Sequence, residues 1–122
     1  MQPNNIDDKE FYFNTVTANF ADAMAYCTNL GAKLFEPKSS SDNIDITDLA
    51  GIYGISDFWI GIHRVSGTLV YASDGAAITY TNWSPGNPSG NGLCVQIGYG
   101  PIYTWDCDVC SKVFAFVCER GK

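Results

Sequence analysis

Five cysteines in a chain of 122 residues constrain the fold more than any other feature of this sequence. They are Cys27, Cys94, Cys107, Cys110 and Cys118. Disulfides persist in oxidising compartments and are rare in the cytosol, so this count indicates a secreted, extracellular protein. Pairing four cysteines and leaving one over allows about 15 connectivities, which the residues alone leave open. A zinc site in the CDVC stretch is not expected, because a second such motif is missing and the chain has a single histidine.

The length predicts one domain over residues 1–122. No stretch approaches the roughly 18 to 20 apolar residues of a membrane-spanning helix, so we expect no membrane insertion. The first ten residues, MQPNNIDDKE, are polar and acidic, unlike a secretory signal, which fits a mature secreted chain. A formal charge of −6 argues against nucleic acid as a partner, because its recognition needs a clustered basic face.

Hydrophobic spacing predicts two helices in the first half of the chain. In NFADAMAYCTNLG, apolar residues and a cysteine recur every three or four positions, with Asn19 as N-cap and Gly31 as the stop. The run SSSDNIDITDLAGIYG begins with serines suited to capping and carries Ile44 and Leu49, so a second helix is expected to end near Gly51 or Gly54.

Short apolar and β-branched runs predict strands elsewhere. They are EFYFNTV at 10–16, FWIGIHR at 58–64, TLVYA at 68–72, ITYTNW at 78–83, LCVQI at 93–97, YTWDCDV at 103–109 and FAFVCER at 114–120. Helices followed by strands indicate a segregated α+β fold. Residues 84–93 form the longest stretch without apolar periodicity, and a loop of that length is commonly functional.

These motifs, in this order, resemble the C-type lectin-like domain from about Phe11 to Glu119. The resemblance is carried by FADAMAYCTNLGAKL, FWIG at 58–61, YTNWSPG at 80–86, LCV at 93–95, the tryptophan of TWDCDVC, and FAFVCE at 114–119. It implies two helices packed on antiparallel sheets, with a long irregular ligand loop that includes residues 82–93. It also implies the disulfides Cys27–Cys118 and Cys94–Cys110.

Cys107 has no partner in that disulfide scheme. An odd cysteine in a secreted chain suggests an intermolecular bond, so we consider a disulfide-linked homo- or hetero-dimer of the same fold. A buried thiol at Cys107 and a Cys94–Cys107 bond are the alternatives.

The residues at the family's calcium-ligand positions depart from its pattern. Calcium-dependent members carry Glu-Pro-Asn or Gln-Pro-Asp in the loop, a glutamate two residues before the next cysteine, and Trp-Asn-Asp on the next strand. The matching positions here hold Asn87, Pro88, Ser89, Gly92, Trp105, Asp106 and Cys107. Calcium affinity depends on carboxylates, and Asp106 alone is left, so we expect no metal cofactor. Asp108 lies near enough to keep a calcium-dependent lectin with a non-standard site as an alternative.

A sugar can be held without metal if amide, hydroxyl and carboxylate groups pair with it while an aromatic ring covers its apolar face. The candidate ligand-binding residues are Asn87, Ser89, Asn91, Asp106, Asp108, Tyr99 and Tyr103. An acetamido group supplies a donor, an acceptor and a methyl group, so glycans with GlcNAc or GalNAc are the expected partners. Invertebrate C-type lectins that work without calcium resemble this loop most.

Two other functional classes are weaker. A protein-binding module of the same fold would need an exposed apolar patch at the loop region. A glycosidase would need Asp106 and Asp108 as its carboxylate pair. Paired surface acids are usually solvated, and His63 belongs to no recognisable catalytic triad, so we do not expect an enzyme.

Overall fold

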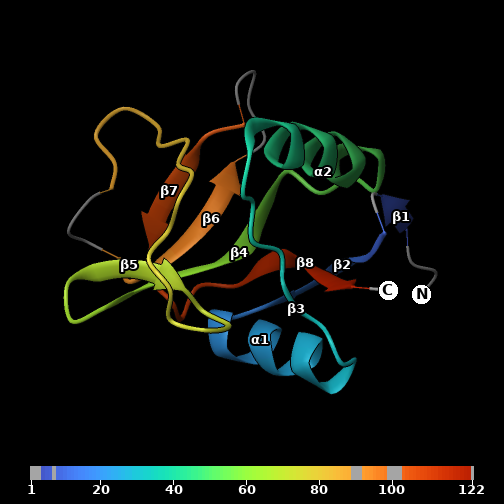
Figure 1. Cartoon of the computed structure of the whole chain (residues 1–122), viewed down its shortest axis with the longest axis horizontal. Coiled ribbons are helices and arrows are strands. Elements are labelled where there is room, and N and C mark those ends of the chain that lie inside the picture. Colours follow the sequence, from blue (N-terminus) through green and yellow to red (C-terminus); the bar gives the residue numbers. More distant parts are fainter. Residues whose placement is uncertain (1–3, 7, 89–91, 99–102, 122) are drawn as a thin grey trace.

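A computed structural model describes residues 4–6, 8–88, 92–98 and 103–121. Its two helices are α1 (Phe20–Asn29) and α2 (Ser40–Ile52). Its strands are β1 (Asn4–Ile6), β2 (Lys9–Ala18), β3 (Lys33–Leu34), β4 (Asp57–Val65), β5 (Thr68–Tyr71), β6 (Cys94–Gly98), β7 (Trp105–Asp108) and β8 (Phe114–Gly121). Figure 1 shows the strands in the middle of the molecule, with the two helices on opposite sides.

The strands form one sheet in the order β1-β2-β8-β4-β6-β7, with β3 paired to β8 and β5 to β4. The α+β class is therefore confirmed, but the sheet is mixed rather than purely antiparallel. Strand β8 runs antiparallel to β2 and parallel to β4, which lie on its two sides. Strand β8, the last in the chain, thereby joins β2 to the part of the sheet formed by β4, β6 and β7.

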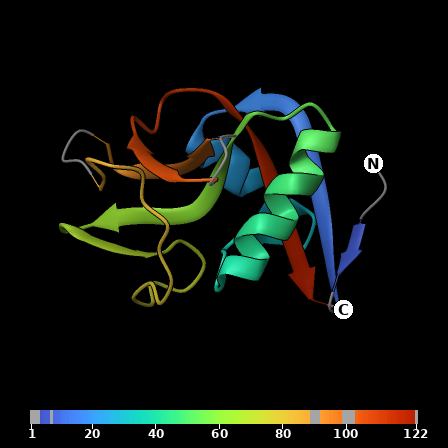
Figure 2. The same ribbon diagram turned by 90° about the horizontal axis from the view of Figure 1, so that it is seen from above.

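The sheet separates two apolar clusters, because successive side chains on a strand point to opposite faces. On β4, Phe58 and Ile60 pack in the cluster covered by α2, whereas Trp59 packs in the cluster covered by α1. On β8, Val117 and Phe116 divide in the same way. Figure 2, turned by 90°, shows α2 lying across the strands.

Helix α1 has the start that its sequence predicts. The side chain of Asn19 accepts a hydrogen bond from the backbone N–H of Asp22 at 2.8 Å, which satisfies one of the donors that a helix N-terminus leaves open. Phe20, Ala23 and Cys27 form the buried stripe. After the helix, Gly31 adopts a φ of 72°, a conformation that favours glycine.

Helix α2 is capped by Ser39, whose hydroxyl accepts from the N–H of Asp42 at 3.1 Å. Its buried face differs from the expected one. Ile44 is 46% exposed, while Asn43 is buried. The amide of Asn43 donates to the carbonyl oxygen of Tyr103 at 3.0 Å and accepts from Trp105 Nε1 at 2.7 Å. These bonds fasten the helix to β7 through a polar residue.

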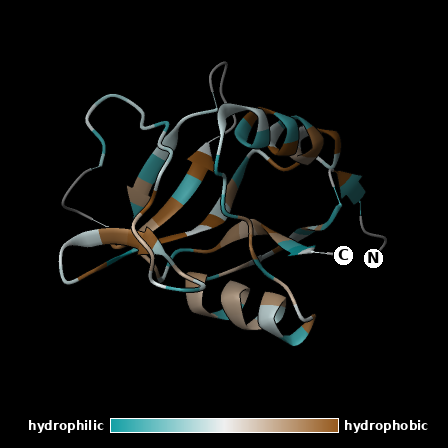
Figure 3. Cartoon of the chain, viewed as in Figure 1, coloured by the Kyte–Doolittle hydropathy of each residue, from teal (hydrophilic) through white to brown (hydrophobic). Residues whose placement is uncertain are grey.

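The prediction of a strand at 78–83 is wrong, because the chain forms no strand there. Only isolated bridges occur nearby, between Val70 and Ala77 and between Trp83 and Trp105. A strand needs a continuous ladder, and here the segment makes a single bridge to β7 at Trp83, whose ring packs against Trp105 at 5.3 Å between centroids. The segment between β5 and β6 is the yellow-to-orange loop in Figure 1 and is mostly white to teal in Figure 3, whereas brown residues mark the strands.

Both predicted disulfides are confirmed. Cys27–Cys118 joins α1 to β8, and Cys94–Cys110 joins the start of β6 to the turn after β7. Among the tryptophans, Trp59 and Trp105 are fully buried and Trp83 is half-buried. The rings of the first two therefore belong to the apolar clusters of the sheet.

Candidate functional site

The loop around residues 82–88 lies along the outer edge of β7. The backbone N–H of Trp105 donates to the carbonyl oxygen of Asn82 at 2.8 Å, and the N–H of Ser84 donates to the carbonyl oxygen of Trp105 at 3.0 Å. Strand β7 is the last in the sheet order, so its edge groups are available for this pairing. The loop is thereby placed next to Asp106, the following residue on β7.

Asn87 is the central contact between loop and strand. Its side-chain N–H groups donate to Ser84 Oγ and to Asp106 Oδ1, both at 3.0 Å. Its Oδ1 accepts from the backbone N–H of Cys107 at 3.1 Å. One amide therefore joins the loop to the backbone and to the side chains of β7. The Asn87–Pro88 peptide bond is cis.

Asp106 is half-buried and lies within hydrogen-bond distance of three other side chains. Its Oδ1 accepts from Ser84 Oγ and from Asn87, and its Oδ2 lies 3.5 Å from Gln96 Nε2. Reasoning from the sequence missed Ser84 and Gln96. The pairing of Gln96 with Asp106 across β6 and β7 follows from strand register, which the sequence does not show.

Asp108 lies two residues further along β7 and carries its own partners. Its Oδ1 lies 3.0 Å from the Lys112 ammonium and accepts from the N–H of Val109 at 2.8 Å. Gly92 packs directly over the Asp108 backbone, so that a Cβ atom at position 92 would overlap its N, C and O atoms. This close approach requires glycine.

Tyr103 is not brought together with Asn87. Its hydroxyl donates to Asp48 on α2, and its carbonyl oxygen accepts from the side-chain amides of Asn43 and Asn82, both at 3.0 Å. The neighbouring Tyr80 ring packs against Trp105, and burial, with the Asp42 carboxylate, raises the pKa of its phenol above the ordinary value. The other predicted ligand residues, Ser89, Asn91 and Tyr99, lie outside the described residues.

Cys107 belongs to neither disulfide and is buried, at 9% exposure. Its sulfur lies 3.8 Å from the Nη2 atom of Arg64. A disulfide to another chain would require this strand to open, because the thiol packs in the cluster covered by α2. The position therefore favours the buried-thiol alternative, while covalent dimerisation remains a prediction.

The residues at the usual calcium-binding position of this fold are a poor match for the ion. Calcium takes six to eight oxygen ligands and depends on carboxylates for affinity. The Asn87 amide and one Asp106 oxygen already bond to each other, Cys107 presents a thiol, and position 92 has no space for a side chain. Across the described residues, no group of three or more His, Cys, Asp or Glu side chains is arranged to hold a metal ion.

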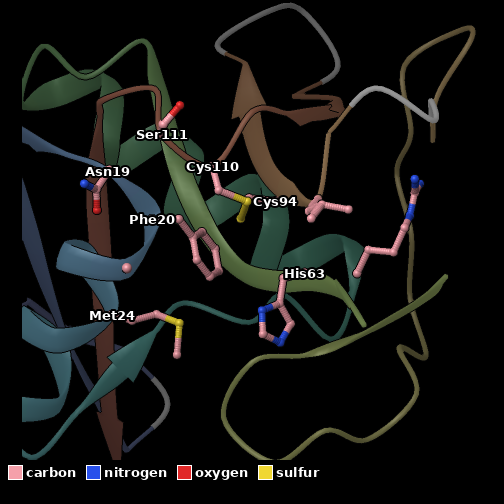
Figure 4. Close-up of a pocket in the computed structure, with 10 residues that line it drawn as sticks. Asn19, Phe20, Met24, His63, Cys94, Cys110 and Ser111 are labelled. Carbon is pink, nitrogen blue, oxygen red and sulfur yellow. A yellow bond between two sulfur atoms is a disulfide. The ribbon is translucent and has the colours of Figure 1, made fainter. Parts of the chain in front are cut away.

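Sequence reasoning also missed a cavity of about 490 Å³ beside the Cys94–Cys110 disulfide. Figure 4 shows Phe20 and Met24 of α1 beside His63 of β4 in its lining. The His63 ring stacks on Phe20 at 5.7 Å between centroids. Leu93, which is 56% exposed, lines the same cavity. The pairing of a helix face with the end of β4 gave no local sequence signal.

Comparison with known proteins agrees with this architecture. The family model of the lectin C-type domain matches residues 16–120. The chain belongs to the C-type lectin domain family. Salivary C-type lectin 2 of Aedes albopictus is 31% identical over 127 residues, covering 93% of this chain and 84% of the relative. Pulmonary surfactant-associated protein D of Bos taurus is 30% identical, but this lectin domain spans only 31% of its length.

Solved structures of C-type lectin domains share the fold. Human lithostathine matches with a TM-score of 0.90 at 25% identity, over 98% of this chain and 88% of that one. The cow CD23 carbohydrate-recognition domain, solved in the presence of a GlcNAc2Man3 oligosaccharide, matches with a TM-score of 0.85 at 25% identity, over 98% and 93%. Members of this family are generally binding modules rather than enzymes. Neither helix of the described chain has the length and apolar character that a bilayer crossing needs.

Proposed function

We propose that this C-type lectin domain binds carbohydrate without calcium and that N-acetylated hexoses, GlcNAc or GalNAc, are its ligand class. The observation that carries the proposal is the Asn87 amide, which joins Ser84, Asp106 and the Cys107 backbone. These bonds hold the loop on β7 with protein atoms alone. A loop fixed in this way is organised before a sugar arrives, so that binding loses less conformational entropy.

The rim of the site offers complementary groups to an acetamido substituent. Asp108 and Lys112 place an acceptor and a charged donor 3.0 Å apart, and Lys112 is 57% exposed. The amide N–H of an N-acetyl group suits the carboxylate, and its carbonyl oxygen suits the ammonium. The exposed Leu93, which follows Gly92, offers an apolar contact for the methyl group. The Asn87 amide and the Asp106 carboxylate lie on the same edge.

A glycan array run in EDTA is expected to show binding to GlcNAc- or GalNAc-terminated glycans that added calcium does not increase. Replacing Asp108 by Asn should weaken that binding about tenfold or more, because hydrogen bonds to charged groups contribute about 1.5 to 3 kcal/mol. Asp45→Asn on the exposed side of α2 removes the same charge and should leave binding unchanged. The absence of binding to every acetamido sugar, or binding that requires calcium, would contradict the proposal.

Useful avidity requires more than one site. A single metal-free sugar site of millimolar affinity gives only about −4 kcal/mol, and joining two sites raises the apparent affinity without new contacts. We therefore propose that the lectin acts as a homo- or hetero-dimer of this fold. The burial of Cys107 favours non-covalent pairing. Two disulfides and a salivary lectin among its relatives support an extracellular location.

A protein-binding module is the second candidate. Exposed aliphatic side chains lie next to cavity-lining positions in the sequence: Val65 is 51% exposed and Val109 is 47% exposed. Leu93 is exposed as well, at 56%, and exposed apolar side chains that gather in one patch mark protein-interaction sites. If the folded protein binds no glycan either with or without calcium, the protein-binding module is the favoured function.

A further inference from the structure

The cavity of about 490 Å³ beside the Cys94–Cys110 disulfide lies on the face of the sheet that α1 covers. The start of α1, the end of β4, the start of β6 and the turn after β7 line it (Figure 4). Its size falls within the range of small-molecule sites, which is about 300 to 1,000 Å³. Neither Asn87 nor Asp106 belongs to its lining, so the contacts of the loop do not account for it.

The exposed surface of the cavity wall is mainly apolar. Phe20, Met24 and Leu93 line it together with the disulfide. Its polar members are Asn19, His63, Arg64 and Ser111. The guanidinium of Arg64 is turned toward the other face of the sheet, where its Nη2 lies 3.8 Å from Cys107 Sγ. An apolar group that enters the cavity therefore leaves water for the margin of the α1 cluster, and this transfer favours binding.

The walls of the cavity are held in place by bonds that need no ligand. The N–H of Phe20 donates to the carbonyl oxygen of Cys110 at 3.1 Å, which ties α1 to the turn after β7. The N–H of Arg64 donates to the carbonyl oxygen of Leu93 at 2.7 Å, which ties β4 to the start of β6. The disulfide joins β6 to the same turn. A cavity fixed in this way loses little conformational entropy when a ligand binds.

The cavity adjoins the Asp108–Lys112 pair. Asp108 is the cross-strand partner of Cys94, and such partners share a face of the sheet with their Cβ atoms about 5 Å apart. Lys112 follows Ser111, and its N–H donates to the carbonyl oxygen of Val109 at 3.1 Å. One turn therefore supplies both the ion pair and part of the cavity wall. A group attached to a sugar that this pair holds is within reach of the cavity.

We propose that the cavity binds the apolar aglycone of an N-acetylated hexose, so that the ligand is a GlcNAc or GalNAc glycoside of a short alkyl chain or an aromatic ring. This inference rests on the proposed acetamido function, because the sugar brings the aglycone to the cavity. Both kinds of aglycone have the same chemistry, an apolar group joined to the sugar through its glycosidic oxygen. The sugar uses Asp108 and Lys112, while the aglycone packs against Phe20, Met24 and the disulfide.

Calorimetric titration of the whole chain in EDTA with the methyl, hexyl and phenyl glycosides of GlcNAc tests the site. The wild type should bind the hexyl or the phenyl glycoside about tenfold or more tightly than the methyl glycoside, because the buried apolar surface adds to affinity. The tighter of the two distinguishes an alkyl from an aromatic aglycone, and a gain with either supports the site. In NMR spectra, that glycoside should shift the amide signals of Ala21 and Met24, which the methyl glycoside should leave in place.

Ala21→Glu separates the cavity from the sugar site. Ala21 is exposed and lines the cavity, and an acid in the first turn suits the start of a helix, so this variant should fold normally. It should lose the gain of the hexyl or phenyl glycoside and keep the affinity for the methyl glycoside. Ala25→Glu makes the same change on the exposed surface of α1, outside the cavity lining, and should keep both.

The possible failures of this test differ from one another. Equal affinity of the wild type for all three glycosides would overturn the aglycone site and leave the acetamido proposal standing. A hexyl or phenyl gain that survives in Ala21→Glu would also overturn the site, because the aglycone would then bind elsewhere. If no GlcNAc glycoside binds, the acetamido proposal fails and the aglycone site fails with it.

Discussion

Replacing Cys27 and Cys118 together by alanine is expected to lower the free energy of unfolding by about 4 to 5 kcal/mol. The bond joins positions 91 residues apart, and a cross-link over so long a loop removes much of the entropy of the unfolded chain. Both sulfur atoms are fully buried, between α1 and β8. Since small domains are stable by only about 5 to 15 kcal/mol, this loss removes a large share of the stability, and the melting temperature should fall accordingly.

Urea denaturation at 25 °C measures this loss. The matched comparison is the Cys94→Ala/Cys110→Ala variant, whose disulfide spans only 16 residues. The same relation gives about 3 kcal/mol for this shorter loop. If the two double variants lose equal stability, or the shorter loop costs more, the unfolded-state explanation of the difference is wrong.

Replacing Gly92 by alanine is expected to cost about 3 kcal/mol, a large effect for a single methyl group. The added Cβ would overlap the backbone of Asp108, which cannot move aside as a flexible side chain would. Gly92→Glu, which restores the family's usual calcium-ligand residue at this position, should be at least as destabilising. It should not create calcium-dependent sugar binding, because the loop would have to lift from β7 to admit it.

Gly121→Ala is the control for the Gly92 variants. A Cβ atom at Gly121 would meet nothing within 4 Å, so its effect should stay within about 0.5 kcal/mol. Thermal unfolding of the three variants beside the wild type gives the comparison. Wild-type stability in Gly92→Ala would show that the loop sits further from Asp108 than the structure places it.

Local signals predicted the parts of the fold whose physics is local. The first helix was predicted to begin after Asn19, because a capping side chain and an apolar stripe both act within a few residues. The strands that carry Trp59 and Phe116 were recognised for the same reason, since their runs of large apolar residues suit a buried sheet. The segment at 78–83 was misread because its composition suits a strand, while its pairing depends on which strand edge lies beside it.

The candidate site was likewise predicted from the sequence in its residues but not in its contacts. Asn87 and Asp106 were named from the sequence, and the structure places their side chains 3.0 Å apart. The sequence did not indicate that these groups bond to each other and to Ser84, so the part of the site that is already satisfied internally could not be anticipated. Tyr103 was assigned to the ligand surface, but its hydroxyl bonds to α2 because the chain turns there toward Asp48.

The sequence by itself predicted a segregated α+β fold, and its resemblance to the C-type lectin-like domain implied the two disulfides and the missing acids at the usual calcium positions. Caps, periodicity and missing carboxylates are local properties, so they can be read without coordinates. Only the tertiary structure decided that Asn87 closes the loop on β7 and that Gln96 meets Asp106 across β6 and β7. Strand register sets those encounters, and register depends on the packing of the whole sheet rather than on any one segment.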